Sequence, residues 1–202
     1  MRRAIGRSVF FISILFVASA ASAQANGGYV GAGGSKASFN SADFGLGLPQ
    51  VAESADRTSV GGKVFAGYRF KNLSGEIAYV DLGTFSYNYN GGASGSAAVD
   101  YKVSGFAASA IVACPVAIDF TVFGRIGAFA STAKATLSGA GIAAGLSGTA
   151  RKTTLYYGAG IQYDFSGGIS GRLEYENFGE VGDSSTGRVK VNLASVSVLL
   201  RF

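Results

Sequence analysis

The chain has 202 residues, of which 14% are charged, whereas roughly a quarter is usual for a soluble protein. It contains no histidine, which excludes histidine-dependent hydrolases, histidine-based zinc sites and the usual general base. Three of its 17 Lys and Arg residues lie in the first 23 positions, so the other 14 nearly balance 12 acidic residues. These 14 form no basic stripe, which argues against nucleic-acid binding.

The first residues predict a cleavable secretory signal peptide. A basic start, MRRAIGR, precedes the apolar run VFFISILFVA over residues 9–18, which is too short to cross a membrane as a helix. Small residues offer a cleavage site before Gln24 and a second one before Asn26. We therefore expect a signal peptide over residues 1–23 and one domain over residues 24–202. The alternative is a buried or anchoring helix.

The rest of the chain predicts eight strands, because short segments alternate between apolar and polar residues. The segments cover residues 28–39, 58–70, 73–83, 99–113, 120–131, 153–165, 169–179 and 188–202. Short turns follow the second, fourth and sixth, whereas the other connections span residues 40–57, 86–98, 134–152 and 179–187. Short turns on one side and longer loops on the other are typical of a membrane barrel. The predicted fold class is all-β, a closed eight-stranded antiparallel transmembrane β-barrel.

The last strand ends at the carboxyl terminus with an apolar face. Val198, Leu200 and Phe202 share that face, and the opposite face is polar except for Leu199. An exposed edge of this kind would be an aggregation hazard, whereas closure in a membrane removes it. We expect these three residues to face lipid and to pair with the first strand.

The same alternation places charged residues inside the barrel. Glu76 lies opposite a face formed by Leu73, Ile77 and Tyr79, and Arg125, Arg172, Glu174 and Glu176 take inward positions on later strands. Lys63 and Arg69 share a face with an apolar misfit, Phe65, and the faces of residues 99–113 are ambiguous because both are apolar.

Aromatic residues gather near the predicted membrane boundaries, as expected for two girdles. Those on the short-turn side are Phe70, Phe120, Tyr163, Phe165 and Phe202, and those toward the long loops are Phe39, Phe85, Tyr157 and Phe178. The alternative is ordinary enrichment of aromatic residues in strands.

Three other features predict no catalytic, cofactor or metal site. Cys114 lies near a turn without a basic partner, so we interpret it as a small apolar filler rather than a reactive thiol. Asp43, Glu53 and Asp56 in the first long connection read as a solvated loop rather than a cation site. Short Gly-Ala-Gly segments are interpreted as strand glycines that allow close packing.

The segments GYRFKNLSGEIAYVDLG (67–83), GAGIQYDFSGGISGRLEYENFGEVGD (158–183) and the terminal SVSVLLRF resemble the small eight-stranded OmpA-like and OmpX-like outer-membrane barrels of Gram-negative bacteria. The resemblance implies an integral outer-membrane protein with a role in envelope integrity and in adhesion-type contacts through its extracellular loops. It also implies contact with outer-membrane lipid and lipopolysaccharide. Phe202, Leu200 and Val198 would form an assembly signal for the barrel-assembly machinery and periplasmic chaperones, and the loops could bind a host or surface ligand. Outer-membrane barrel enzymes use a catalytic histidine, so we expect no enzyme, and we expect no periplasmic peptidoglycan-binding domain.

In the family that the chain resembles, the residues matching Glu76 and Arg172 form an interior ion pair that blocks the channel. A second family pair, a lysine and a glutamate, is replaced here by Ile111 and Gln162. We expect a closed barrel in which Glu174 or Arg125 shares the Glu76–Arg172 contact, without a charge-exchange gate. The alternative function is a narrow pore or transporter for small molecules. A soluble lipocalin-like barrel is disfavoured because charges point inward.

Overall fold

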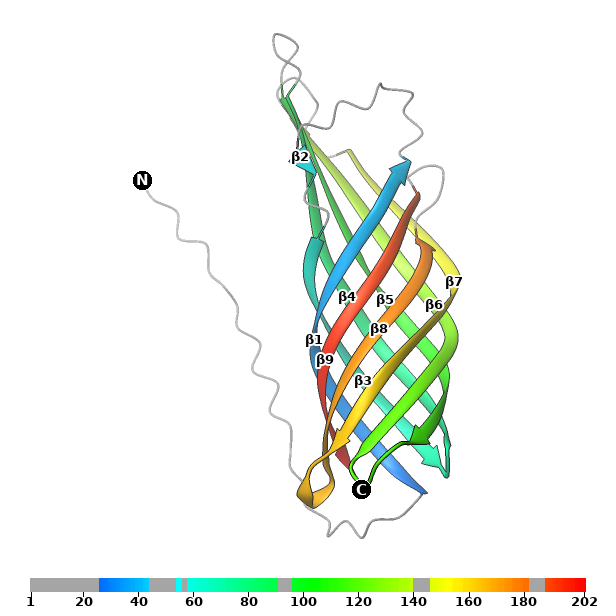
Figure 1. Ribbon diagram of the computed structural model, residues 1–202. Helices are drawn as coiled ribbons and strands as arrows, with labels where there is room; N and C mark the ends of the chain where they lie inside the picture. The colour runs from blue at the N-terminus through cyan, green and yellow to red at the C-terminus, as the bar shows by residue number, and fades with distance from the viewer. Residues whose placement is uncertain (1–25, 44–53, 56–57, 91–95, 140–145, 182–187) are drawn as a thin grey trace, which may run out of the picture.

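The computed structural model describes residues 26–43, 54–55, 58–90, 96–139, 146–181 and 188–202, which form a closed antiparallel barrel (Figure 1). Its eight long strands are β1 (Asn26–Asp43), β3 (Thr58–Phe70), β4 (Leu73–Asn90), β5 (Ser96–Pro115), β6 (Phe120–Gly139), β7 (Leu146–Asp164), β8 (Ile169–Val181) and β9 (Arg188–Arg201). A two-residue strand, β2 (Ser54–Ala55), pairs with β4, and a short 3₁₀ turn (Ser166–Gly168) links β7 to β8. No helix among the described residues is long and apolar enough to span a membrane. The predicted fold class is confirmed.

The first and last strands close the barrel. Val30 lies opposite Leu200 and Ala32 lies opposite Val198 in the β1–β9 ladder. The ladder continues past the strand end, where the Phe202 N–H donates to the Gly28 carbonyl at 2.9 Å. The Phe202 side chain is 64% exposed on the outer face. The predicted pairing of the terminal strand is therefore present.

Five strands are at least five residues longer than the sequence predicts. β1 and β4 to β7 have 18 to 20 residues, whereas about 9–11 suffice to cross a membrane. Most of the described residues in the predicted loops over 86–98 and 134–152 are strand, so those loop boundaries are wrong. Above the membrane the outer face of a strand meets water instead of lipid, so the apolar alternation that defines the lipid-crossing part disappears.

Successive side chains along each strand alternate between the outer face and the lumen, as predicted. Ile77 and Phe106, 67% and 70% exposed, lie on the outer face, which lipid covers. The ambiguous strand β5 turns Tyr101, Val103, Ala107 and Ile111 inward, and the two misfits, Phe65 and Leu199, are buried inside. An eight-stranded barrel has an interior just wide enough to be filled by side chains, and these apolar residues help to fill it.

The aromatic girdle prediction holds at the short-turn end and fails for one residue at the other end. Phe70, Phe120, Phe165 and Phe202 are exposed on the outer face. Tyr157 is also exposed there, but Phe178 is fully buried in the lumen, where its ring stacks on Tyr156 at 4.8 Å. The side chains of Phe39 and Phe85 lie outside the described residues.

Inward glycines make room for inward aromatic rings. A Cβ added to Gly160 would lie 2.4 Å from the Phe123 ring, so this ring occupies the volume that a side chain on the neighbouring strand would take. The same arrangement recurs in the pairs Gly31–Phe65, Gly67–Tyr29, Gly105–Phe129 and Gly127–Tyr156. The high glycine content thus reflects the packing of a narrow barrel.

Two bulges of the same design bend β4 and β8 near the loop end. In each bulge, three consecutive residues lie where the strand register shifts: Asp81, Leu82 and Gly83 on β4, and Asn177, Phe178 and Gly179 on β8. The glycine has a positive φ in both. The Gly83 N–H donates to the Asp81 carboxylate at 2.9 Å, and the Gly179 N–H donates to the Asn177 side chain at 2.9 Å. Each bulge places its apolar residue, Leu82 or Phe178, inside the barrel.

We predict that Gly83→Ala destabilises the barrel by about 1–3 kcal/mol, because φ of +83° is strained for a residue with a Cβ. The added methyl would also lie 2.0 Å from the Ser59 hydroxyl oxygen. Urea unfolding of the refolded barrel in lipid vesicles measures this loss. Gly75→Ala on the same strand is the control, because its Cβ meets no atom within 4 Å. Equal stabilities of the two variants would contradict the assigned bulge.

Candidate functional site

Six charged side chains form one cluster inside the barrel. They are the charged side chains buried within the described part of the chain: Lys63, Glu76, Arg125, Arg172, Glu174 and Glu176. β3, β4 and β6 contribute one each, and β8 contributes three. Three are positive and three are negative, so the charged cluster is neutral as a whole. Burying unpaired charges would cost several kcal/mol each, so this balance is a condition for burying them.

Every member of the charged cluster contacts at least one opposite charge. Arg172 Nη1 lies 2.7 Å from Glu76 Oε2, and Arg125 Nη1 lies 3.0 Å from Glu76 Oε1. Arg125 Nη1 also lies 3.0 Å from Glu176 Oε1, and Lys63 Nζ lies 2.9 Å from Glu176 Oε2. Glu174 forms ion pairs with both Lys63 and Arg125. The cluster is thus one connected network rather than separate pairs.

Small residues on intervening strands allow these long contacts. Arg125 on β6 and Glu176 on β8 are separated by β7, where Gly158 lies opposite both of them. A Cβ on Gly158 would lie 2.9 Å from Glu176 Cγ, so a larger residue would displace this carboxylate. Lys63 on β3 similarly faces Gly33 on β1 and reaches β8 past the serines of β9. Glycine on an intervening strand, together with the serines of β9 in the case of Lys63, therefore permits ion pairs between strands that are not neighbours.

Aromatic rings surround Arg172 beside the charged cluster. The carbon of its guanidinium lies 5.5, 5.1 and 5.0 Å from the ring centroids of Tyr29, Phe65 and Phe123. Cation–π attraction favours this arrangement, particularly in a desolvated site. The Tyr29 hydroxyl also donates to Glu76 at 3.1 Å. The Arg172 guanidinium therefore contacts three aromatic rings in addition to the Glu76 carboxylate.

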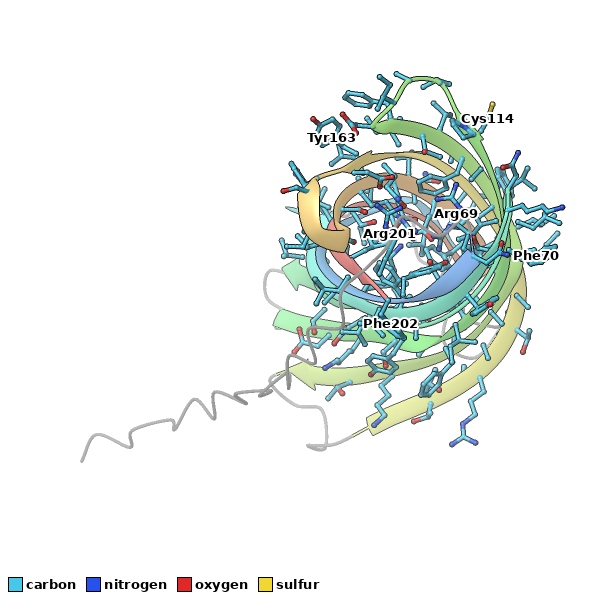
Figure 2. All side chains as sticks on the ribbon, turned by 90° about the horizontal axis from the view of Figure 1, so that it is seen from below. Arg69, Phe70, Cys114, Tyr163, Arg201 and Phe202 are labelled. Atoms are coloured by element: carbon cyan, nitrogen blue, oxygen red, sulfur yellow. The ribbon has the colours of Figure 1, made fainter. Side chains whose placement is uncertain are left out.

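A chain of polar contacts connects the charged cluster with the mouth at the short-turn end. Arg172 donates to Gln162 at 3.2 Å, Gln162 donates to Asp164 at 2.7 Å, and Arg201 lies 3.1 Å from Asp164. Seen from this end, Arg69 and Arg201 point into the ring of strands, whereas Phe70, Cys114 and Tyr163 lie around its outside (Figure 2). A cavity of about 20 Å³ between Arg172 and the mouth has room for about one water molecule.

Apolar side chains fill the lumen on the loop side of the charged cluster. Phe129 packs against Phe178, with ring centroids 4.7 Å apart, and Phe178 stacks on Tyr156. Leu82, Val103, Val181, Val191 and Leu193 are also almost fully buried and belong to the same apolar cluster. The interior is therefore sealed twice along its length, by the charged cluster and by this apolar core.

The structure brings together the four lumen residues expected from the sequence, Glu76, Arg125, Arg172 and Glu174. Lys63 and Glu176 lie on predicted inward faces and also belong to the charged cluster, although they are not among the predicted site residues. Positions 111 and 162 carry no charge, and a lysine–glutamate contact is made elsewhere, by Lys63 on β3 with Glu174 and Glu176 on β8.

The remaining candidates stay outside the site. Cys114 is exposed on the outer face next to the short-turn end, rather than buried. No group of three or more His, Cys, Asp or Glu residues that could hold a metal ion occurs among the residues that the structure describes. Glu53 and Asp56 lie outside those residues, as does the predicted signal peptide over residues 1–23.

Residues 23–202 match the family model of the OmpA-like transmembrane domain. The chain therefore belongs to this family, and it is an integral β-barrel protein of the cell outer membrane. None of the curated proteins compared with this chain matches it.

Solved structures show the same fold. Neisserial surface protein A (NspA) is 18% identical, with a TM-score of 0.60 over 87% of this chain and 97% of its own. Ail, the attachment invasion locus protein of Yersinia pestis, solved in complex with the heparin analogue sucrose octasulfate, is 19% identical, with a TM-score of 0.55 over 88% of this chain and 99% of its own. The outer-membrane protein AlkL is 13% identical, with a TM-score of 0.51 over 94% of this chain and 97% of its own.

We predict that Glu76→Ala destabilises the barrel by about 3–5 kcal/mol, because it leaves two buried arginines without this carboxylate. Arg172→Ala added to it restores a neutral cluster of two positive and two negative groups. The double variant should therefore lose less stability than the sum of the two single losses. Denaturant unfolding in lipid vesicles measures all three variants.

Asp81 and Lys102 provide the control pair for this cycle. Their charged atoms lie 3.7 Å apart, and their side chains are 35% and 55% exposed. Solvent-exposed pairs of this kind typically contribute less than about 1 kcal/mol. The stability losses of Asp81→Ala and Lys102→Ala should be nearly additive. If the losses of Glu76→Ala and Arg172→Ala were equally additive, the buried contact would not stabilise the barrel.

Proposed function

We propose that this protein is a closed outer-membrane barrel with a structural and surface-interaction role, without enzymatic activity and without a conducting pore. The observation that carries the proposal is the interior packing. The charged cluster and the apolar core seal the lumen one after the other, so that opening one of them would still leave the other in place. A transport pathway through the lumen would require both to move.

The shape of the loop end supports a role at the cell surface. β4 to β7 have 18 to 20 residues, whereas on the opposite side β1 has 18 and β3, β8 and β9 have 13 or 14. The wall that contains β4 to β6 extends furthest at the end opposite the carboxyl terminus (Figure 1), and strands of this length project beyond the membrane. An extended sheet held above the membrane is suited to adhesion-type contacts and to carrying loops that bind a surface ligand.

The alternative, a narrow pore or transporter for small molecules, is tested by single-channel recording in planar bilayers. We predict that the purified barrel produces no discrete conductance steps, because the cavity between Arg172 and the mouth holds about one water molecule. The matched variant combines Glu174→Ala and Lys63→Ala with Phe129→Ala and Phe178→Ala, which opens both seals and should conduct. Discrete conductance of the unmodified protein would overturn the proposal.

We further propose that Phe202, Leu200 and Val198 form the assembly signal read by the barrel-assembly machinery and periplasmic chaperones, after removal of residues 1–23. The exposed apolar face of the terminal strand supports this proposal.

We predict that Phe202→Asp lowers the amount of barrel in the outer membrane severalfold, because a charge replaces the outward terminal aromatic. Heat-modifiable mobility in gel electrophoresis of outer-membrane fractions measures the folded barrel. Asp119→Asn in an exposed turn is the control, since it changes a charge at the same end of the barrel without touching the terminal strand. Unchanged levels of the Phe202→Asp variant would contradict the assignment.

A further inference from the structure

Three arginines meet at the small cavity inside the short-turn mouth of the barrel. Arg69 on β3, Arg172 on β8 and Arg201 on β9 all line this cavity of about 20 Å³. Arg172 is 5% exposed and lies deepest, whereas Arg69 and Arg201 are half-buried and point into the ring of strands at the mouth (Figure 2). The cavity with its three arginines is called the arginine site below.

The charges around the arginine site do not balance. Arg172 pairs with Glu76 at 2.7 Å, within the neutral charged cluster, and Arg201 pairs with Asp164 at 3.1 Å. Arg69 forms no ion pair within the described part of the chain, and its Nε–H donates to a backbone carbonyl of the adjacent turn at 2.9 Å. A neutral carbonyl oxygen does not cancel the charge of a guanidinium. The inward side chains at this mouth therefore carry one excess positive charge.

Asp164 is held away from Arg69 by its other contacts. Its carboxylate accepts hydrogen bonds from Gln162 on β7 at 2.7 Å and from Ser170 on β8 at 2.8 Å, and it pairs with Arg201 on β9. Arg69 lies on β3, which is separated from β9 by β1. The excess charge is therefore located on the β3 side of the mouth.

The arginine site also presents hydrogen-bond donors that lack an acceptor. The Nε–H of Arg172 is buried and has no hydrogen-bond partner among the described residues. Ser74 and Thr121 line the same cavity and bring hydroxyl groups to it. A buried donor without an acceptor costs free energy, so an acceptor placed in the cavity would stabilise the barrel.

The charge and the size of the arginine site favour a carboxylate. A monovalent anion balances one excess positive charge, whereas a divalent phosphate or sulfate would leave an excess negative charge. The cavity has room for about one water molecule, which is the room that one carboxylate oxygen needs. A guanidinium presents two parallel N–H donors that match the two oxygens of a carboxylate.

We propose that the arginine site binds a carboxylate group that enters from the periplasm, the compartment that the short turns of such barrels face. One oxygen occupies the cavity beside Arg172, the other pairs with Arg69, and the rest of the ligand stays in the open mouth. The ligand is a small organic acid or the carboxyl end of a peptide chain. This site goes beyond the structural role proposed above. It lies on the mouth side of the charged cluster, so it does not depend on whether the lumen is closed.

The test follows the arginine side-chain N–H resonances of the refolded barrel by NMR. The barrel is held in zwitterionic detergent micelles without chloride or carboxylates, at about pH 6, where an added carboxylate is ionised. Sodium acetate should shift the Nε–H resonances of Arg69 and Arg172 along one saturable curve. Arg69→Gln should weaken acetate binding, followed through Arg172, by about tenfold or more, because a charged donor is lost. Arg69→Lys keeps the charge but not the paired donors, so it should restore only part of the affinity.

The matched control is Lys71→Gln, which removes an exposed cation at the same end of the barrel from a residue that does not line the cavity. It should leave acetate affinity within about threefold of the unmodified protein, because exposed charges are screened by salt. Without acetate, Arg69→Gln should unfold at the same or a higher urea concentration than the unmodified barrel, since a half-buried unpaired charge is gone. Unfolding at a lower concentration would show that Arg69 is already neutralised in the barrel, which contradicts the excess charge.

Two further ligands distinguish the source of the carboxylate. A short peptide that binds more tightly than acetate, and that loses its binding when its carboxyl end is amidated, would identify a chain end. Equal binding of the peptide and acetate would identify a small organic acid.

Two outcomes would overturn the proposal. Equal affinity for chloride and acetate would indicate a site for any monovalent anion rather than for a carboxylate. Equal acetate affinity of Arg69→Gln and Lys71→Gln would show that Arg69 is not special among the cations at this end.

Discussion

The whole structure depends on closing the hydrogen-bond ladder between β1 and β9. Within a bilayer no water pairs with backbone N–H and C=O groups, so a sheet can cross only if it has no free edge. The β1–β9 register, extended by the Phe202 N–H on the Gly28 carbonyl, removes that edge. Once the sheet is closed, alternate side chains must face lipid or lumen. The position of every charged and apolar residue in the membrane follows from that division.

Closure of only eight strands also creates a crowded interior. The crowding is resolved by pairing large side chains with glycines on adjacent strands, as for Phe123 and Gly160. The absence of a side chain on Gly158 likewise leaves room for Arg125 on β6 to contact Glu176 on β8. Glycine therefore sets both the packing and the electrostatics of the lumen, because it decides which charged side chains can meet. The result is a neutral charged cluster covered by an apolar core, which is the physical basis for a closed barrel.

The barrel fold and four residues of the charged cluster could be predicted from the sequence, because apolar and polar residues alternate wherever one face of a strand meets lipid. This alternation places Glu76, Arg125, Arg172 and Glu174 inside the barrel and Phe202 outside. The parity that places Arg172 and Glu176 inside also places Phe178 inside, which contradicts a position in an outer girdle. Proximity in sequence to a strand end was weaker evidence than parity.

Other features could not be read from the chain. Lys63 and Glu174 are 111 positions apart and come together only through the barrel curvature and the small residues between them. The upper parts of β5 and β6 carry no lipid-facing pattern, so their length depends on cross-strand pairing beyond the membrane.

Access of water-soluble reagents to the middle of the lumen tests the closed interior most directly. Ser197, 1% exposed, lies opposite Arg172 at the level of the charged cluster. In a Cys114→Ser background, Ser197→Cys should stay unmodified by a small charged thiol reagent added to both sides of a bilayer, until the barrel is unfolded. Lys71→Cys in the exposed turn should react at once under the same conditions. Modification of Cys at position 197 in the folded barrel, at a rate near that of the turn, would contradict a sealed lumen.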